Sequence, residues 1–512
     1  MPTPHEKLAA SLAALEKLQR DGRRVFRSRE LSRTDRERLV AQGFLRVVIK
    51  GWLISVNTGT AEGDTTPWHA SFWEFCTAYC EERFGNDWHL SPEQSLLLHA
   101  ESTVIPQQII VYTSKGTNNA IALLFGISLY DLRQKQMPPP EDLVTRAGLH
   151  IHAPAAALIK VPESFFMNHP VEAQVVLAAI RDSSELLGRL LDGGHSVVAG
   201  RLAGALRHVG RAALADDIVK TMKAAGYDVR ESNPFNPEAK LGALSPGVPP
   251  IVGRIEALWE AAREAVLGVF PESPGPPGDQ ERYMRFVEEI YVSDAYHSLS
   301  IEGYSVTSEL IERLRSGGWN PDGDQRDREN RDALAARGYW QAFQLVKADV
   351  AKIIGGADAA ALTLSSHRDW YRALFEPSVA AGLLRASALA GYRHHRVYLR
   401  GSRHVPPNHE VVPDAMTALF GLLAREAEPG VRAVLGHWLF GYVHPYPDGN
   451  GRMARFLMNT MLASGGFPWT VIRVEDRKAY LAALESASVA QDVEPFARFI
   501  AERVTWSLEK AA

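Results

Sequence analysis

Apolar positions recur at helical spacing over most of this 512-residue chain, and strictly alternating apolar positions fill only short stretches. Near the N-terminus the spacing predicts three helices, over 7–20, 28–31 and 34–42. The stretch that follows, FLRVVIKGWLIS, is rich in β-branched residues and bends at Lys50-Gly51, which predicts a β-hairpin. Ser28 and Ser32 are the expected N-caps of the two short helices, and Gly43 the expected C-cap. Three helices followed by a two-stranded wing indicate a winged helix-turn-helix over residues 1–53.

This first segment is also basic. It holds twelve Lys/Arg against six Asp/Glu, so its net charge is +6, whereas the whole chain has −4. A winged helix with this charge favours DNA. The contacts would come from Arg33, Arg36, Arg38 and the wing residue Lys50, with Arg23, Arg24, Arg27 and Arg29 along the backbone. The alternative is a small dock for a protein partner, with solvated arginines. LVAQGFLRVVIKGWLIS loosely resembles the N-terminal winged helix of abortive-infection antitoxins, which implies a transcriptional repressor.

Residues 54–231 mix both periodicities. QQIIVYTSK and AGLHIHAP are expected strands, and 170–191 and 211–226 are expected helices. No catalytic constellation occurs here, so the segment is interpreted as a mixed α/β spacer, a homodimer surface or an extension of the DNA-binding module. Residues 232–250 concentrate Pro and Gly and predict a linker. A second Pro/Gly stretch, 271–279, is either a loop between helices or an alternative boundary.

Composition narrows the possible classes of protein further. Only two cysteines occur, Cys76 and Cys80, which excludes a disulfide framework and favours a reducing cytoplasm. The N-terminus has acids and no apolar core, so no signal peptide is expected. No uncharged apolar run reaches eighteen residues, so no membrane span is expected. From residue 251 to 512 the pattern predicts a second, mainly helical domain.

HPYPDGNGRMAR, residues 444–455, concentrates chemistry in this second domain. Gly449-Asn450-Gly451 feeds the N-terminus of a predicted helix, where free amides and the helix dipole make an anion site. Arg452 and Arg455 lie three apart and suit phosphate. Asp448 suits Mg²⁺ beside a polyphosphate, and His444 is a candidate general base. These parts together indicate nucleotidyl or phosphoryl transfer.

The stretch resembles the Fic family signature, a histidine followed by an acid, GNGR and a second arginine. The match covers His444, Pro445, Asp448, Gly449, Asn450, Gly451, Arg452 and Arg455, with Tyr446 in place of phenylalanine. The resemblance implies an α-helical Fic fold over 251–512 and transfer of AMP from ATP to a Ser, Thr or Tyr hydroxyl of a target protein. It makes His444 the base and Asp448 the Mg²⁺ ligand. Asn450 and the loop amides would hold the α-phosphate, and the two arginines the outer phosphates.

RVYLRGSRHVPP, residues 396–407, interrupts the helices. It resembles the family's flap, a β-hairpin at whose edge a target segment adds by main-chain pairing. The expected strands are 396–400 and 403–405, and the expected docking residues are Val397, Tyr398, Leu399, Arg400, Gly401 and Ser402. An ordinary surface hairpin is the alternative.

YHSLSIEG closes a predicted helix over 282–302. Helical spacing from Met284 through Tyr291 carries Ser298 and Glu302 onto its apolar face, and Gly303 is the expected C-terminal cap. The Ser-x-x-x-Glu-Gly pattern resembles the Fic inhibitory motif. In that self-inhibited subclass the glutamate forms an ion pair with the second motif arginine, here Arg455, and blocks the γ-phosphate.

The sequence therefore predicts a multi-domain, mainly α, cytoplasmic protein adenylyltransferase restrained by Glu302, with ATP and Mg²⁺ at its site and DNA as a second partner. Two rivals stay open. An AMP-removing hydrolase would use the same site and depend on Glu302. A nucleotide-sensing transcription regulator would bind ATP without transferring any part of it.

Overall fold

The computed structural model describes residues 3–57, 63–236, 244, 247–316 and 331–511. It is mainly α-helical, as predicted, and divides into two compact units. The first comprises Met1–Ala239, Ala243–Pro250 and Tyr398–Val405, and the second comprises Lys240–Gly242, Ile251–Val397 and Pro406–Ala512. The predicted linker, 232–250, lies partly outside the described residues.

The N-terminal segment has the predicted order of helices and wing. Its elements are α1 (Pro4–Leu18), the 3-10 helix η2 (Ser28–Glu30), α2 (Arg33–Ala41), β2 (Leu45–Ile49) and β3 (Trp52–Ser55). Ser32 caps α2 by accepting a hydrogen bond from the Asp35 amide, and Gly43 ends it with φ 73°. The prediction for Ser28 is wrong, because Ser28 lies inside η2 and Arg27 precedes it. The short strand β1 (Val25–Arg27) was missed; it pairs with β3 and gives the order β1-β3-β2.

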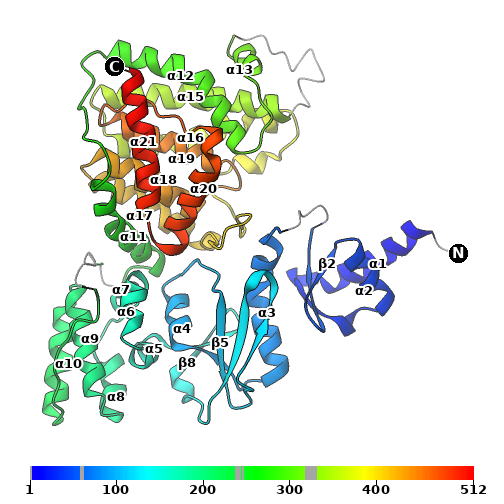
Figure 1. Ribbon diagram of the computed structural model, residues 1–512, viewed down its shortest axis with the longest axis vertical. Coiled ribbons are helices and arrows are strands. Elements are labelled where there is room, and N and C mark those ends of the chain that lie inside the picture. Colours follow the sequence, from blue (N-terminus) through cyan, green and yellow to red (C-terminus); the bar gives the residue numbers. More distant parts are fainter. Residues whose placement is uncertain (1–2, 58–62, 237–243, 245–246, 317–330, 512) are drawn as a thin grey trace. The chain divides into compact units, whose positions relative to one another are not determined.

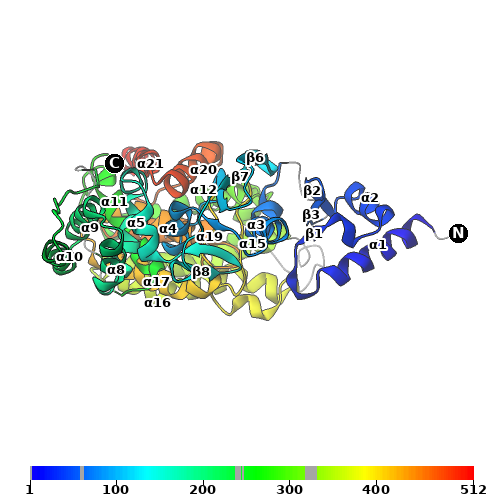
Figure 2. The ribbon, with the colours of Figure 1, turned by 90° about the horizontal axis from the view of Figure 1, so that it is seen from below.

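The N-terminal segment does not end at residue 53. Strand β3 continues to Ser55, and Trp52 and Ile54 share one hydrophobic cluster with Phe75 and Tyr79 of α3 (Thr66–Phe84). The Trp52 ring meets that of Phe75 edge-on at 5.6 Å. Three apolar side chains, Leu15, Leu39 and Leu53, contribute to a second, smaller core inside the N-terminal segment itself. Both views show α1 and α2 beside the small sheet (Figures 1 and 2).

A second sheet follows, with strand order β4-β5-β7-β6. Its strands are β4 (His89–Leu90), β5 (Gln108–Thr113), β6 (Asn119–Ala122) and β7 (Ser128–Arg133). The two central strands run parallel, with Gln108 opposite Ser128. Helix α4 (Pro92–His99) separates β4 from β5, and a hairpin of β8 (Leu143–Arg146) and β9 (Leu149–His152) follows the sheet. Only β5 and β9 of these strands were predicted.

Helices complete the first unit. They are α5 (Pro154–Lys160), α6 (Ser164–Asn168), α7 (Pro170–Ala179), α8 (Ser184–Asp192), α9 (Ser196–His208) and α10 (Ala212–Ala224). The single helix expected over 170–191 is therefore two helices. The backbone becomes extended at Ile180, which ends the first helix. The second helix starts after Asp182 and Ser183, and the Asp182 side chain accepts a hydrogen bond from the Ser184 amide.

Helices also build the second unit. They are α11 (Pro250–Leu267), α12 (Gln280–Ile301), α13 (Ser308–Arg315), α15 (Arg331–Ile354), α16 (Ala359–Ala380), α17 (Val412–Arg425), α18 (Pro429–Val443), α19 (Asn450–Ala463), α20 (Arg477–Glu485) and α21 (Glu494–Ala511). The Pro/Gly stretch 271–279 is the loop between α11 and α12.

Helix α19 lies at the centre of this unit, and nearly every residue along it is buried. It packs against α15, α16 and α18. The helices of this unit cross one another closely. Gly338 of α15 touches the backbone of α16 so closely that a Cβ there would lie 2.0 Å from the Leu374 carbonyl oxygen. A buried central helix gives its N-terminus a fixed position, which is what a site built on that end requires. No helix among the described residues is long and apolar enough to span a membrane.

Candidate active site

The histidine motif forms the loop between α18 and α19. Helix α18 ends at His444, whose backbone is left-handed with φ 51° and whose amide still bonds the Phe440 carbonyl at 2.9 Å. Gly449 precedes α19 with φ 77°, a conformation that glycine adopts without strain. The two left-handed residues turn the chain sharply enough to bring His444 back beside the start of α19.

Asn450 holds this loop in shape. Its side-chain oxygen accepts the Tyr446 amide at 2.9 Å, and its Nδ2 donates to the Tyr446 carbonyl at 2.8 Å. The Tyr446 ring is fully buried and stacks on Tyr371 of α16, with centroids 3.9 Å apart. Tyrosine therefore takes the packing place of the family's phenylalanine. Direct contact between Asn450 and a phosphate stays a prediction, because in this structure the side chain shapes the loop.

Arg452 is a buried cation held by aromatic rings. It is 1% exposed and lies over Tyr304 at 5.2 Å and Phe375 at 5.1 Å. Among the described residues its Nε and Nη2 atoms find no hydrogen-bond acceptor, and the nearest carboxylate, that of Asp448, is 3.8 Å away. Buried guanidinium donors without acceptors are costly, so their presence at a helix N-terminus indicates a place for an anionic ligand.

Arg455 binds two residues of the predicted inhibitory motif. Its Nε donates to the Ser298 hydroxyl at 2.8 Å, and its Nη2 donates to the Ser298 carbonyl at 3.0 Å and to Glu302 Oε1 at 2.7 Å. Ser298 lies on α12, and Glu302 caps that helix just before Gly303, whose φ is 85°. The structure thus brings Ser298 and Glu302 of the predicted inhibitory motif to the second motif arginine. Arg455 Nη1 has no acceptor within the described part of the chain.

The Glu302 carboxylate occupies the anion position itself. A Cβ on Gly451 would lie 2.1 Å from Glu302 Oε1, so the carboxylate rests directly on the first turn of α19. Burial raises the pKa of Glu302, but the charges of Arg455 and Arg452 and the bond to Arg455 lower it by more. Glu302 is therefore ionised at neutral pH and stands where a phosphate group would be attracted.

His444 is placed to act as a neutral base. Burial, and next the charge of Arg393, lower the pKa of its imidazole to about 4. An imidazole with this pKa is unprotonated throughout the neutral range and can accept a proton from a substrate.

Asp448 fits one role of a magnesium ligand. Its Oδ1 accepts the Gly449 amide at 2.6 Å, and its side chain is 63% exposed at the entrance of the loop. The described residues contain no cluster of three or more His, Cys, Asp or Glu that could hold a metal ion alone. Mg²⁺ takes one or two carboxylates and completes its shell with phosphate oxygens and water, and the exposed carboxylate of Asp448 fits that need.

Arg393, which was not predicted from the sequence, contacts the backbone around the motif histidine. It is 2% exposed, and its guanidinium donates to the carbonyls of His444 at 2.8 Å, His395 at 2.9 Å and Val443 at 3.3 Å, and also to that of Pro407. Its own amide bonds the Pro445 carbonyl at 2.8 Å. Arg393 thus fixes the strained backbone of His444. In the sequence the only signal was its place among basic residues before the flap segment.

Replacing Arg393 by methionine is expected to lower kcat by ~10²-fold in an active background, since small misplacements of a catalytic group have effects of that size. The kcat of Arg393→Lys should fall between those of the parent protein and Arg393→Met, because lysine keeps the charge. The loss of charge in Arg393→Met should also raise the pKa of His444, so the acid limb of the rate profile should move to higher pH. A pH–rate series on the three proteins measures this. An unmoved limb in Arg393→Met would reduce Arg393 to a packing residue.

The flap segment is not a self-contained hairpin, which corrects the expectation for 396–400 and 403–405. The turn is present, with Gly401 at φ 75° and the Ser402 amide bonded to the Leu399 carbonyl at 3.2 Å. Neither arm is a strand, and in the second arm the Arg403 carbonyl and the Val405 amide bond Ile105 and Thr103 in place of the first arm. Tyr398–Val405 belongs to the first unit, where His404 pairs with Val104.

The residues expected to contact DNA are spread over the winged helix. Arg33 is exposed on α2 and pairs with Glu37 at 2.8 Å. Arg36 is half-buried and donates to the Ser28 carbonyl at 3.2 Å, and Lys50 is exposed at the turn of the wing. Arg38, half-buried, bonds the Ser11 hydroxyl at 2.6 Å.

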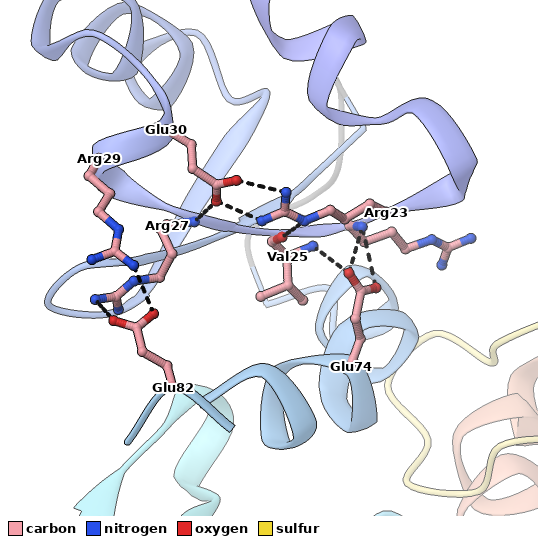
Figure 3. A network of polar contacts seen from close by, with 8 residues as sticks. Arg23, Val25, Arg27, Arg29, Glu30, Glu74 and Glu82 are labelled. Carbon is pink, nitrogen blue, oxygen red and sulfur yellow. Dashed lines mark hydrogen bonds and ion pairs between the residues drawn. The ribbon is translucent and has the colours of Figure 1, made fainter. Parts of the chain in front are cut away.

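Acids of the same unit contact several arginines before α2 (Figure 3). Arg23 makes a bidentate pair with Glu30 at 2.7 and 2.6 Å, and Glu82 of α3 pairs with Arg27 and, at 3.6 Å, with Arg29. Glu74 of α3 accepts the amides of Arg24 and Val25. Arg23 and Arg27 therefore pair with Glu30 and with an acid of α3, and their contact with DNA stays a prediction.

Comparison with known proteins agrees with the motif. Residues 361–462 match the Fic/DOC family, so this part of the chain is a Fic domain. The chain is 30% identical over 225 residues to the protein adenylyltransferase Fic of Nematostella vectensis, covering 42% of this chain and 48% of that protein. It is 28% identical over 253 residues to the protein adenylyltransferase Fic of Drosophila melanogaster, covering 49% of this chain and 46% of that protein. It therefore spans about half the length of the curated relatives it matches.

Solved Fic structures align with parts of this chain at low TM-scores. Fic-1 (residues 134–508) from C. elegans is 18% identical and aligns with 63% of this chain and 91% of its own, at a TM-score of 0.37. A Fic domain containing signalling protein from Bacteroides thetaiotaomicron is 20% identical, with 51% and 95% covered and a TM-score of 0.35.

Proposed function

We propose that this chain is a protein adenylyltransferase, which moves AMP from ATP to a hydroxyl side chain of a target protein. The observation that carries the proposal is the occupied anion position. The Glu302 carboxylate rests on the first turn of α19, bonded to Arg455, while buried donors of Arg452 and Arg455 lack acceptors among the described residues. A triphosphate supplies the acceptors that these donors need, and His444 lies at the other end of the same loop.

In the proposed reaction a target hydroxyl attacks the α-phosphorus of ATP, and His444 takes the hydroxyl proton. The new bond joins the hydroxyl oxygen to the α-phosphorus, and the bond to the β-phosphate oxygen breaks to release diphosphate. The amides at the start of α19 and the two arginines hold the phosphate oxygens. Asp448 would hold Mg²⁺, which neutralises charge on the leaving diphosphate. Arg393 keeps the histidine backbone in position.

Glu302 is the proposed brake. Its carboxylate and the outer phosphates of ATP compete for Arg455, so ATP cannot reach the pose in which its α-phosphorus faces the hydroxyl. The AMP-removing hydrolase stays an alternative, because the same carboxylate could orient a water molecule toward an AMP-protein bond.

The direct test compares two labels on one protein. The Glu302→Gly chain is incubated with Mg²⁺ and ATP labelled at the α- or the γ-phosphate, and the protein is separated from nucleotide. Label retained from α-ATP alone supports adenylyl transfer, and label from γ-ATP alone would replace the proposal with phosphorylation. A pre-adenylylated chain that loses AMP only when Glu302 is present would favour the hydrolase.

A second function, DNA binding, is supported by the winged-helix topology of the N-terminal segment. Helix-turn-helix proteins contact DNA through their second helix, and the order α1, η2, α2 with the β1-β3-β2 sheet and the exposed turn residue Lys50 supports the same role for α2 and Lys50 here. We propose that the chain binds DNA through Arg33, Arg36 and Lys50, and through this contact represses its own promoter.

Lys50→Ala is expected to weaken binding to the chain's own upstream DNA and to lower the salt slope by about one unit, since each phosphate contact contributes ~0.9. Lys220→Ala, an exposed lysine on α10, is the matched control and should change neither. Gel shifts in a salt series measure both quantities. If the unaltered chain gives no shift at low salt, the winged helix is a dock for protein.

A further inference from the structure

The flap segment is already paired with another part of the same chain. Tyr398–Val405 leaves the second unit after Val397, packs within the first unit and returns at Pro406. There the Ile105 amide donates to the Arg403 carbonyl at 3.0 Å, and the Val405 amide donates to the Thr103 carbonyl at 2.7 Å. These two bonds flank the antiparallel pair Val104–His404.

Side chains add to the pairing. His404 is 2% exposed, and its Nδ1 lies 2.9 Å from the Thr103 hydroxyl. The Arg403 guanidinium donates to the Ile105 carbonyl through Nε at 3.2 Å and Nη2 at 3.0 Å. Val405 packs on the same hydrophobic cluster as Ile105. Arg400, which precedes these residues in the flap, pairs with Asp64 at 3.2 Å. The contact therefore includes main-chain bonds, a buried hydroxyl–imidazole contact and apolar packing.

This is the kind of bonding that β-strand addition gives to an incoming peptide, namely main-chain bonds for affinity and alternate side chains for specificity. We propose that Thr103–Ile105 is a resident occupant of the flap edge, and that a target docks by presenting an extended, β-branched segment with a threonine-like hydroxyl over His404 and displacing it. The inference rests on the proposed function, in which the flap docks the target.

The resident segment sets a threshold for docking. Because it is part of the same chain, its local concentration at the flap is in the millimolar range typical of tethered ligands. A weakly matched segment cannot displace it, so only a target with additional contacts elsewhere would dock. The arrangement also assigns a role to residues 54–231, in which no catalytic constellation was found.

The experiment locks the occupant in place. Val104 and His404 form a pair of the narrow antiparallel type, whose Cα atoms are typically about 4.5 Å apart, close enough for a disulfide. The full chain with Val104→Cys and His404→Cys is prepared oxidised and reduced. The native thiols, Cys76 and Cys80, are both buried and do not compete. The probe is a fluorescein-labelled peptide of residues 99–109, HAESTVIPQQI, and binding is measured by anisotropy.

In the reduced form no covalent bond holds the resident segment, so peptide at millimolar concentration, which matches the local concentration of a tethered segment, is expected to exchange into the edge. Oxidation should weaken its binding at least tenfold, and a chain with Val104→Ser and His404→Ser should be insensitive to oxidant. Equal affinity in both redox states, or no binding to the reduced form at millimolar peptide, would overturn the inference. Transfer of α-label by the Glu302→Gly chain tests the enzyme separately, so a failed docking edge and a failed adenylyltransferase give different results.

Discussion

Replacing Glu302 by glycine is expected to raise AMP transfer by ~10²-fold or more, because breaking a desolvated ion pair is worth ~3–5 kcal/mol and each 1.4 kcal/mol is about tenfold. The change removes the carboxylate from the first turn of α19 and leaves Arg455 free to bind the outer phosphates. The side chain of Glu302 keeps 29% of its surface exposed, which places the gain toward the lower end of that range. The measurement is the initial rate of α-label transfer at saturating ATP.

Two charge-removing variants separate the brake from a general effect on α12. Glu302→Gln keeps the size of the side chain without its charge and should release most of the activity. Glu289→Gln changes an exposed acid on the same helix and should leave the rate unaltered. An unaltered rate in both Glu302 variants, with ATP bound, would contradict a brake at this position.

Removing the base has the second large effect. In the Glu302→Gly background, His444→Asn is expected to lower the rate by ~10²–10⁴-fold, the range for a positioned general base. Asparagine is the informative replacement, because the backbone of residue 444 has φ 51° and asparagine tolerates that conformation far better than alanine. His444→Ala should lose the same rate and in addition some stability. The measurements are α-label transfer and thermal unfolding.

The pH dependence checks the same role. The pKa of His444 is lowered to about 4, so the imidazole is unprotonated above that pH. Its ability to act as a base is lost as the pH falls through that value. The rate of the Glu302→Gly chain should therefore show no histidine limb between pH 6 and 8. Because the Glu302 charge raises the pKa of His444, removing it moves the limb further down. A limb near pH 6.5 that persists in His444→Asn would assign the titration to another group.

The local site was predictable because its residues are close in sequence. Short-range geometry gives the turn of Gly449–Gly451 into a helix and the sequence order of His444, Asp448 and the arginines. It also gives the helical spacing that brings Ser298 and Glu302 to one face of α12. The meeting of Glu302 with Arg455, 153 residues apart, came from a family resemblance, and the structure contains that bond.

Long-range pairing could not be predicted in the same way. Arg393 binds carbonyls, which carry no sequence signature, and the flap pairs with Thr103–Ile105 some three hundred residues away. Strand β1 is three residues long and exists because β3 pairs with it. The basic charge of the N-terminal segment was real, but the acids that neutralise Arg23 and Arg27 lie on η2 and α3. Charge counts cannot distinguish arginines paired internally from those free to meet a partner.

Intact-mass spectrometry of the Glu302→Gly chain, after incubation with ATP and Mg²⁺, tests the central claim most directly. The account predicts that this chain gains whole AMP groups, that the unaltered chain gains far fewer, and that adding His444→Asn abolishes the gain. A Glu302→Gly chain that binds ATP and keeps its original mass, or gains phosphate in place of AMP, would contradict it.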